Sequence, residues 1–246
     1  MRTPIMAANW KMYKNESEAL DFVKKFKPLV SDAKNVEIII NAPYTLLSTL
    51  KHSLLNSNIS LGAENMHFED KGAFTGEISA TMLKDYVKYV IIGHSERRQY
   101  FNESNEIINK KIKKALEHGL KVIFCLGETL EQREKGVTNE VVSIQLKEGL
   151  AGIHDMANIV VAYEPVWAIG TGKTATPEQA QEVHAFLRQQ LSNLFGSDVA
   201  EEVRILYGGS VKPDNVAKLM SQNDIDGGLV GGAALEPESF AKLVKF

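Results

Sequence analysis

The sequence predicts an α/β protein, a closed (β/α)8 barrel that forms a single domain over residues 1–246. Eight short runs rich in Val and Ile recur along the chain. These runs lack the alternation of polar and apolar residues that marks strands with one solvated face. Each run is followed by a helical pattern, and eight such units in about 250 residues is the size of this barrel.

Each of the eight runs is predicted to be a strand that is buried on both faces of a parallel sheet. In chain order they are 5–8, 36–40, 59–63, 89–92, 121–126, 159–162, 203–207 and 225–230. An open, doubly wound sheet is the main structural alternative. Because no Gly-x-Gly-x-x-Gly motif follows the first run, the dinucleotide-binding variety of that fold is disfavoured.

The clearest helix is predicted to begin after Thr176. Thr176 suits the N-cap, Pro177 suits the first helical position, and Gln179 completes a capping box. Gly196 is predicted to end this helix, and a second helix is predicted over 104–117. The apolar stripe of the first helix is expected to comprise Ala180, Val183, Leu187, Leu191 and Leu194.

Composition excludes several classes of function. The net charge of −3 gives no general attraction to nucleic acid or to anionic membranes. No apolar stretch approaches the roughly 18 residues that span a bilayer, and no signal peptide is visible. The single cysteine, Cys125, lies in an apolar run and is predicted to be buried and unreactive. These features favour a cytoplasmic protein without disulfides.

Glu164 is the strongest candidate for a catalytic group. Active residues of these barrels lie at the carboxyl ends of strands, and Glu164 directly follows the sixth run. Neighbours such as Val166 and Trp167 are expected to desolvate its carboxylate, which raises its proton affinity and makes it a better general base. The alternative is a structural ion pair at the end of a strand.

Three polar residues follow the first and fourth runs. His94 is predicted to lie at the start of a helix, where the positive potential favours a neutral ring that can still donate a hydrogen bond. Lys11 can neutralise a phosphate or an oxyanion, and Asn9 can orient Lys11 or touch the substrate directly. The alternatives are a helix-capping histidine and a solvated lysine. Arg97 and Arg98 are interpreted as salt-bridging residues.

Glycine pairs follow the last two runs. Gly208-Gly209-Ser210 and Gly231-Gly232 lie where barrels of this kind bind phosphate through backbone N–H groups. Tight turns are the alternative, but two pairs on adjacent strands favour a phosphate site. The segment 165–173 mixes apolar residues with two glycines, so it is predicted to be a lid that folds over a small phosphorylated substrate, although a rigid turn would have the same composition.

Together, these segments resemble the triosephosphate isomerase family over the whole chain. The segments are Ala-Asn-Trp-Lys at 8–11, Gly-His-Ser-Glu-Arg-Arg at 93–98, Tyr-Glu-Pro-Val-Trp-Ala-Ile-Gly-Thr-Gly-Lys at 163–173, Tyr-Gly-Gly-Ser at 207–210 and Gly-Gly at 231–232. Two positions depart from the family. Ala234 stands where serine is frequent, and Glu64 stands where glutamine is common.

The resemblance implies an isomerase of glycolysis and gluconeogenesis that interconverts dihydroxyacetone phosphate and glyceraldehyde 3-phosphate, with no metal and no organic cofactor. Glu164 would take a proton from C1 and return one at C2. His94 would polarise the carbonyl and shuttle protons between the enediolate oxygens, and Lys11 would stabilise negative charge beside Asn9. Glu96 matches a glutamate that supports the site. The groups implied to hold the phosphate are Gly170, Ser210, Gly231 and Gly232.

The resemblance also implies a homodimer. The loop 65–77 would insert into the partner, and Thr75 would help to order Asn9 and Lys11 across the interface. Two alternatives remain at this point, another sugar-phosphate isomerase and a barrel that binds a phosphometabolite or a protein without catalysis. The first would not be expected to carry Gly-His-Ser-Glu at 93–96 together with the lid. The loss of Glu164, His94 or Lys11 would indicate the second, and all three are present.

Overall fold

The structure, a computed structural model, describes residues 2–169 and 174–246. Its elements follow the predicted alternation of strands and helices. In chain order they are β1 (Ile5–Asn9), α1 (Glu16–Val30), β2 (Glu37–Ala42), η1 (Tyr44–Leu46), α2 (Leu47–Ser53), β3 (Ile59–Ala63), α3 (Ala80–Leu83), β4 (Tyr89–Ile92), α4 (Ser95–Tyr100), α5 (Asn105–Glu117), β5 (Lys121–Leu126), α6 (Leu130–Glu134), α7 (Thr138–Gly149), β6 (Ile159–Tyr163), η2 (Val166–Ala168), α8 (Pro177–Phe195), α9 (Ser197–Glu202), β7 (Ile205–Tyr207), α10 (Val216–Met220), β8 (Gly227–Val230), η3 (Gly232–Ala234) and α11 (Pro237–Val244).

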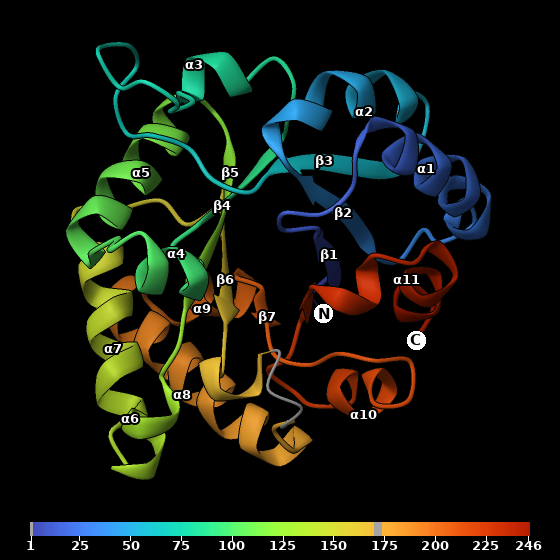
Figure 1. Cartoon of the computed structure of the whole chain (residues 1–246). Helices are drawn as coiled ribbons and strands as arrows, with labels where there is room; N and C mark the ends of the chain where they lie inside the picture. Colours follow the sequence, from blue (N-terminus) through green and yellow to red (C-terminus); the bar gives the residue numbers. More distant parts are fainter. Residues whose placement is uncertain (1, 170–173) are drawn as a thin grey trace.

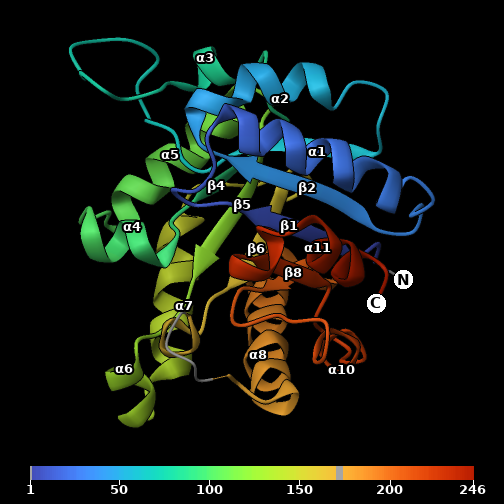
Figure 2. The same cartoon turned by 45° about the vertical axis from the view of Figure 1, so that its right-hand side comes forward.

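The strands form a closed barrel in the order β1 to β8, and the predicted fold class is confirmed. All neighbours are parallel, and β1 closes the barrel by pairing with β8, with Ile5 opposite Gly227. The longer helices lie around the outside of the strands (Figures 1 and 2). Because every strand is parallel, all eight carboxyl ends meet at one rim.

The alternation of side chains along each strand divides the apolar core into two layers. Met6 and Ala8 of β1 face the helices, whereas Ile5 and Ala7 face the barrel interior. Burial on both faces explains why the strands read as continuous apolar runs. The interior layer consists of Ile5, Ala7, Ile39, Tyr89, Ile91, Ile123, Cys125, Val160, Ala162, Leu206 and Leu229.

Helix α8 begins and ends where the sequence predicts. Thr176 caps the backbone N–H of Gln179, whose side chain accepts the Thr176 N–H in return, and Gly196 ends the helix with a φ of 90°. One residue of the predicted stripe is wrong, because Leu194 is 41% exposed. In the last turn Phe195 packs against the core instead, since it lies four residues after buried Leu191 and therefore on the same face.

Helix α5 confirms the second predicted helix. Ser104 caps its first turn, and its apolar face is buried. Of the helices in the described residues, none is long and apolar enough to cross a membrane.

Candidate active site

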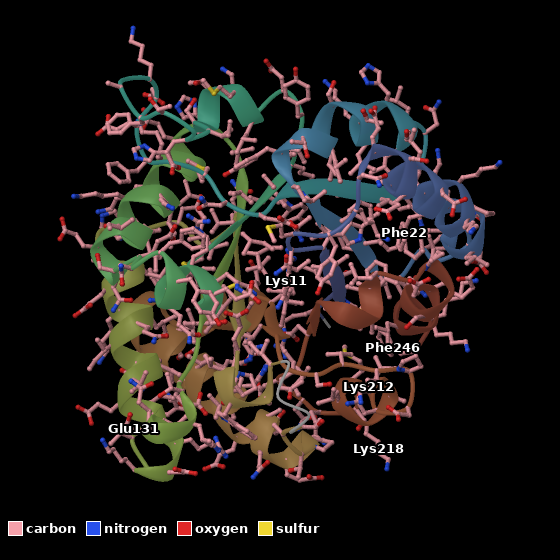
Figure 3. All side chains as sticks on the ribbon, viewed as in Figure 1. Lys11, Phe22, Glu131, Lys212, Lys218 and Phe246 are labelled. Carbon is pink, nitrogen blue, oxygen red and sulfur yellow. The ribbon has the colours of Figure 1, made fainter. Side chains whose placement is uncertain are left out.

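A cavity of about 710 Å³ opens among the residues that follow the strands. Figure 3 labels two lysines that line it, Lys11 near the centre of the view and Lys212 on the α10 side. Lys212 was missed because no pattern in the sequence distinguishes it from a solvated lysine. The cavity brings together seven predicted residues, namely Asn9, Lys11, His94, Glu164, Ser210, Gly231 and Gly232.

Glu164 lies at the end of β6 with only 1% of its surface exposed. Its backbone N–H donates to the Leu126 carbonyl at 2.8 Å, which continues the pairing of β5 with β6. The carboxylate is held by two donors, the backbone N–H of Ser95 and the Nε2 of His94, each at 2.9 Å. Glu164 also lines a second cavity of about 630 Å³, so its side chain lies between two cavities.

The electrostatics of Glu164 differ from the expectation. Burial alone would raise its pKa, but His94, the Ser95 N–H and Lys11 together hold the pKa below its ordinary value. The prediction that desolvation would make Glu164 a better base is therefore wrong for this arrangement. Hydrogen bonds to the charged form outweigh the loss of water.

His94 is the N-cap of α4, and its Nδ1 accepts a hydrogen bond from the Glu96 N–H at 3.2 Å. An accepting Nδ1 carries no proton, so Nε2 is the nitrogen that donates to Glu164. Burial alone would lower the pKa of His94, but the carboxylates of Glu164 and Glu96 raise it. Contact with Glu164 therefore opposes the predicted shift in pKa, although an Nδ1 that accepts the Glu96 N–H belongs to the neutral ring that the sequence predicted.

Asn9 and Glu96 fix the two ends of Lys11. The Asn9 Oδ1 accepts the Lys11 backbone N–H at 3.1 Å, as predicted, and supports a left-handed backbone with a φ of 55°. At the other end the Lys11 Nζ forms an ion pair with the Glu96 carboxylate. This pairing places a cation in the cavity wall together with His94.

The rim of β7 and β8 is built differently, from backbone and small residues. Ser210, Gly231 and Gly232 line the cavity, and η3 begins at Gly232. A Cβ built on Gly232 would meet nothing within 4 Å, so the backbone there is open to the cavity. An exposed N-terminus of a short helix beside glycines suits an anion such as phosphate.

Two other glycines set the space around Glu164. A Cβ on Gly127 would stand 1.7 Å from the Glu164 carbonyl oxygen, far inside any contact distance. On the opposite side, a Cβ on Gly208 would stand 2.8 Å from the Glu164 Cγ. Both neighbouring strand ends therefore need glycine for Glu164 to occupy its place.

Glu128 is a functional candidate that the sequence did not reveal. Its fully buried carboxylate accepts the Trp167 Nε1–H at 2.8 Å and the Tyr163 hydroxyl at 3.0 Å. The Arg133 guanidinium lies 3.3 Å from the same carboxylate and 5.0 Å from the centre of the Trp167 ring. These contacts fix the first part of the segment predicted to be a lid. Only a fold would bring the four together, since no motif links them.

Three predicted residues remain, Gly170, Glu96 and Thr75. Gly170, with the lid residues up to 173, lies outside the described residues. Glu96 does not line the main cavity but contacts Lys11 and His94, which do. Thr75 is exposed on the loop 65–77, away from the cavity, so this chain alone does not bring it to the site.

One group of potential metal ligands occurs in the described residues. Asp70, Glu117 and His118 have ligand atoms within 4.8 Å of one another. Asp70 already accepts a hydrogen bond from Lys114 and contacts His118 at 2.7 Å. None of the three lines the main cavity, so the group contributes nothing to its chemistry.

Comparison with known proteins gives the family. The sequence model of triosephosphate isomerase matches residues 4–246. The chain is 56% identical to the triosephosphate isomerase of Carboxydothermus hydrogenoformans over 248 residues, covering 100% of this chain and 99% of the relative. It is 56% identical to that of Geobacter metallireducens over 249 residues and 54% identical to that of Fusobacterium nucleatum over 248 residues, with the same coverage in both. The chain belongs to the triosephosphate isomerase family.

Proposed function

We propose that Glu164, His94 and Lys11 carry the isomerase reaction in the main cavity. Membership of the family makes the chain an isomerase that interconverts dihydroxyacetone phosphate and glyceraldehyde 3-phosphate. The observation that carries the proposal is the direct contact of a buried carboxylate with an imidazole, 2.9 Å apart, in the wall of a cavity that also holds a lysine. That set supplies a base, a hydrogen-bond donor and a positive charge.

Glu164 is the base that abstracts the proton. While its carboxylate accepts hydrogen bonds from His94 and Ser95, its pKa is held low and it is a weak base. Turning toward a bound substrate removes those hydrogen bonds but keeps the side chain out of water, so its basicity rises. The carboxylate then takes a proton from C1 of the ketose, the C1–H electron pair becomes the C1=C2 double bond, and the carbonyl pair moves onto the C2 oxygen to give an enediolate. His94 carries a proton from the C1 oxygen to the C2 oxygen, and the carboxyl group returns a proton to C2, which leaves an aldehyde at C1 and a hydroxyl at C2.

His94 and Lys11 stabilise the enediolate. Once Glu164 leaves, the Nε2–H of His94 is free to donate to a substrate oxygen, while Nδ1 remains tied to the Glu96 N–H. The loss of the carboxylate removes a cause of the raised pKa of His94, and burial then favours the neutral ring. Lys11 offsets the negative charge that develops on the oxygens.

The phosphate is assigned to the β7–β8 rim. Backbone N–H groups of Ser210, Gly231 and Gly232 suit its oxygens, with Gly170 as a further predicted contact. Lys212 adds a cation to the same cavity. Holding the phosphate there would keep the three-carbon skeleton between the rim and Glu164.

Glu164→Asp tests the assignment of the base. The shorter side chain places the carboxylate about 1 Å farther from carbon, and we expect kcat to fall by about 100-fold. The measurement is a coupled assay with glyceraldehyde 3-phosphate. Glu131→Asp on exposed α6 is the matched control and should leave kcat unchanged. An unchanged kcat for Glu164→Asp would contradict the assignment of Glu164 as the base.

We also propose that the protein is a homodimer. The loop 65–77 projects from the barrel, as Figure 2 shows in teal, and Phe74 on it is 43% exposed. A cavity of about 430 Å³ beside Lys11 is lined by the exposed side chains of Met12 and Phe101. The loop of a second copy would cover this apolar cavity and bring Thr75 near Lys11.

Light scattering after gel filtration measures the dimer directly, with an expected mass of twice 27.3 kDa. Thr75→Arg on the loop should shift the mass toward one chain, while Lys34→Glu, an exposed change outside the loop, should not. A wild-type mass of one chain would contradict the proposal.

The proposed location is the cytoplasm, because the reaction belongs to glycolysis and gluconeogenesis. Cell fractionation followed by the coupled assay would test it. Activity confined to the extracellular or membrane fraction would contradict this location.

A further inference from the structure

Arg98 occupies the point where the pairing of β4 with β5 stops. The register of the two strands ends with Ile92 opposite Phe124, because Gly93 turns the chain with a φ of 79°. Past that point the Arg98 guanidinium donates to the carbonyl oxygens of both strand ends. Its Nε donates to the Gly93 carbonyl at 2.8 Å and its Nη2 to the Cys125 carbonyl at 3.0 Å.

The Arg98 guanidinium makes a third hydrogen bond through its remaining nitrogen. Its Nη1 donates to the Oδ1 of Asn105, the first residue of α5, at 2.6 Å. The sequence suggested a salt bridge for Arg98, but none of the ion pairs among the described residues includes it. A planar fork with donors in fixed directions suits two carbonyls and an amide, and a lysine cannot match it.

Gly93 and Arg98 depend on each other sterically. A Cβ on Gly93 would stand 3.0 Å from the Cys125 carbonyl oxygen and 3.2 Å from the Arg98 Nη2, besides requiring a left-handed backbone. The turn therefore needs glycine, and the guanidinium fills the space that glycine leaves. The next two residues, His94 and Ser95, provide the groups that hold Glu164.

Arg98 is also a half-buried cation that lines the second cavity, of about 630 Å³, together with Glu164. Burial lowers the pKa of Arg98, while the negative charge of Glu164 acts in the opposite direction, so the two charges interact. Guanidinium groups remain protonated in proteins. Arg98 therefore carries a positive charge in the wall of the same cavity.

We propose that Arg98 is a positioning residue of the isomerase. Its guanidinium replaces the β4–β5 hydrogen bonds past Ile92 and fixes the 93–95 turn, from which His94 and Ser95 reach Glu164. The inference rests on the proposed roles of Glu164 and His94. The phosphate rim of β7 and β8 is built from other elements, so Arg98 should act on turnover and leave substrate binding nearly unchanged.

Arg98→Lys separates geometry from charge. The lysine keeps the positive charge but cannot bridge both carbonyls, so we expect kcat to fall about 10- to 100-fold through misplacement of His94. KM should stay within about twofold of wild type, since the phosphate contacts are unchanged. Arg98→Gln loses the charge as well as the planar fork, and its kcat should fall at least as far at unchanged KM.

Asn105→Ala tests the inference even when the Arg98 variants fail to fold. Of the guanidinium's contacts it removes only the outermost, together with the exposed hydrogen bond that the Asn105 Nδ2 donates to Glu148 at 2.8 Å. We expect kcat to fall about two- to fivefold at unchanged KM, the worth of one hydrogen bond. Wild-type kcat in Asn105→Ala, or in a folded Arg98→Lys, would overturn the inference. A wild-type chain without isomerase activity would instead contradict the proposed function.

Discussion

The cavity has two halves that are built in different ways. On the β4–β6 side, His94 and Glu164 are nearly buried side chains whose hydrogen bonds fix them against each other. On the β7–β8 side, Ser210, Gly231 and Gly232 present backbone to the cavity. Proton transfer requires ionisable groups in tuned surroundings, whereas holding an anion requires only N–H groups that point at it. We therefore expect the first half to determine kcat and the second to determine KM.

Glu164→Gln should have the largest effect on this division. The amide keeps nearly the same shape but cannot take a proton, so we expect kcat to fall by about 10³- to 10⁴-fold with a small change in KM. Steady-state assays in both directions measure it, with Glu131→Gln as the control. A loss of less than tenfold would mean that another group abstracts the proton.

Gly232→Ala probes the opposite half. Its Cβ would meet nothing within 4 Å, so the barrel should fold normally while the methyl group occupies space meant for substrate. We expect KM to rise about tenfold, as losing one or two hydrogen bonds to an anion would cause, with kcat within about threefold of wild type. Thermal unfolding checks the fold. If kcat fell more than KM rose, the two halves would not be separable.

The pH dependence of the wild-type enzyme shows whether Glu164 changes partners. In the free protein its pKa is held below the ordinary value, so the acid limb of kcat/KM should lie below the pH at which a free glutamate titrates. In the complex the contact with His94 is released, and the acid limb of kcat should lie at higher pH. Rates are expressed per dianionic substrate, because the phosphate itself titrates near pH 6. Coincident limbs would show that Glu164 does not leave His94.

Glu64→Gln is a change outside both halves of the cavity, and we expect it to alter stability rather than kcat or KM. Burial raises the pKa of Glu64 to about 8, and its Oε1 has no hydrogen-bond partner. The folded chain therefore binds this proton more tightly than the unfolded chain does. Stability is full below the pKa of an unfolded glutamate, about 4.3, and declines as pH rises toward 8.

The amide of Glu64→Gln removes that decline. At pH 8 we expect a gain of about 1–2 kcal/mol, about 3–6 °C in Tm, and no gain at pH 4. Turnover should stay at the wild-type level. Scanning calorimetry at both pH values measures the effect, and an equal gain at pH 4 would show that ionisation of Glu64 is not its cause.

The sequence was most informative where one local signal determines the structure. Burial on both faces produced unbroken apolar runs, and the capping residues of α8 lie within one turn of each other, so both were predictable. The errors at the site arose where the outcome depends on distant residues. The direction of the Glu164 pKa shift depends on a contact 70 positions away in the chain, with His94. Similarly, the carbonyl contacts of Arg98 exist only because β4 and β5 are neighbours.

The glycines on either side of Glu164 have a consequence for directed evolution. A library that redesigns the cavity for a new sugar would normally randomise every residue near the base. Gly127 and Gly208 should be left out, because any side chain there would collide with Glu164 and nearly all such clones would be inactive. Gly232 has open space instead, so substrate preference can be varied there while the proton-transfer apparatus keeps its place.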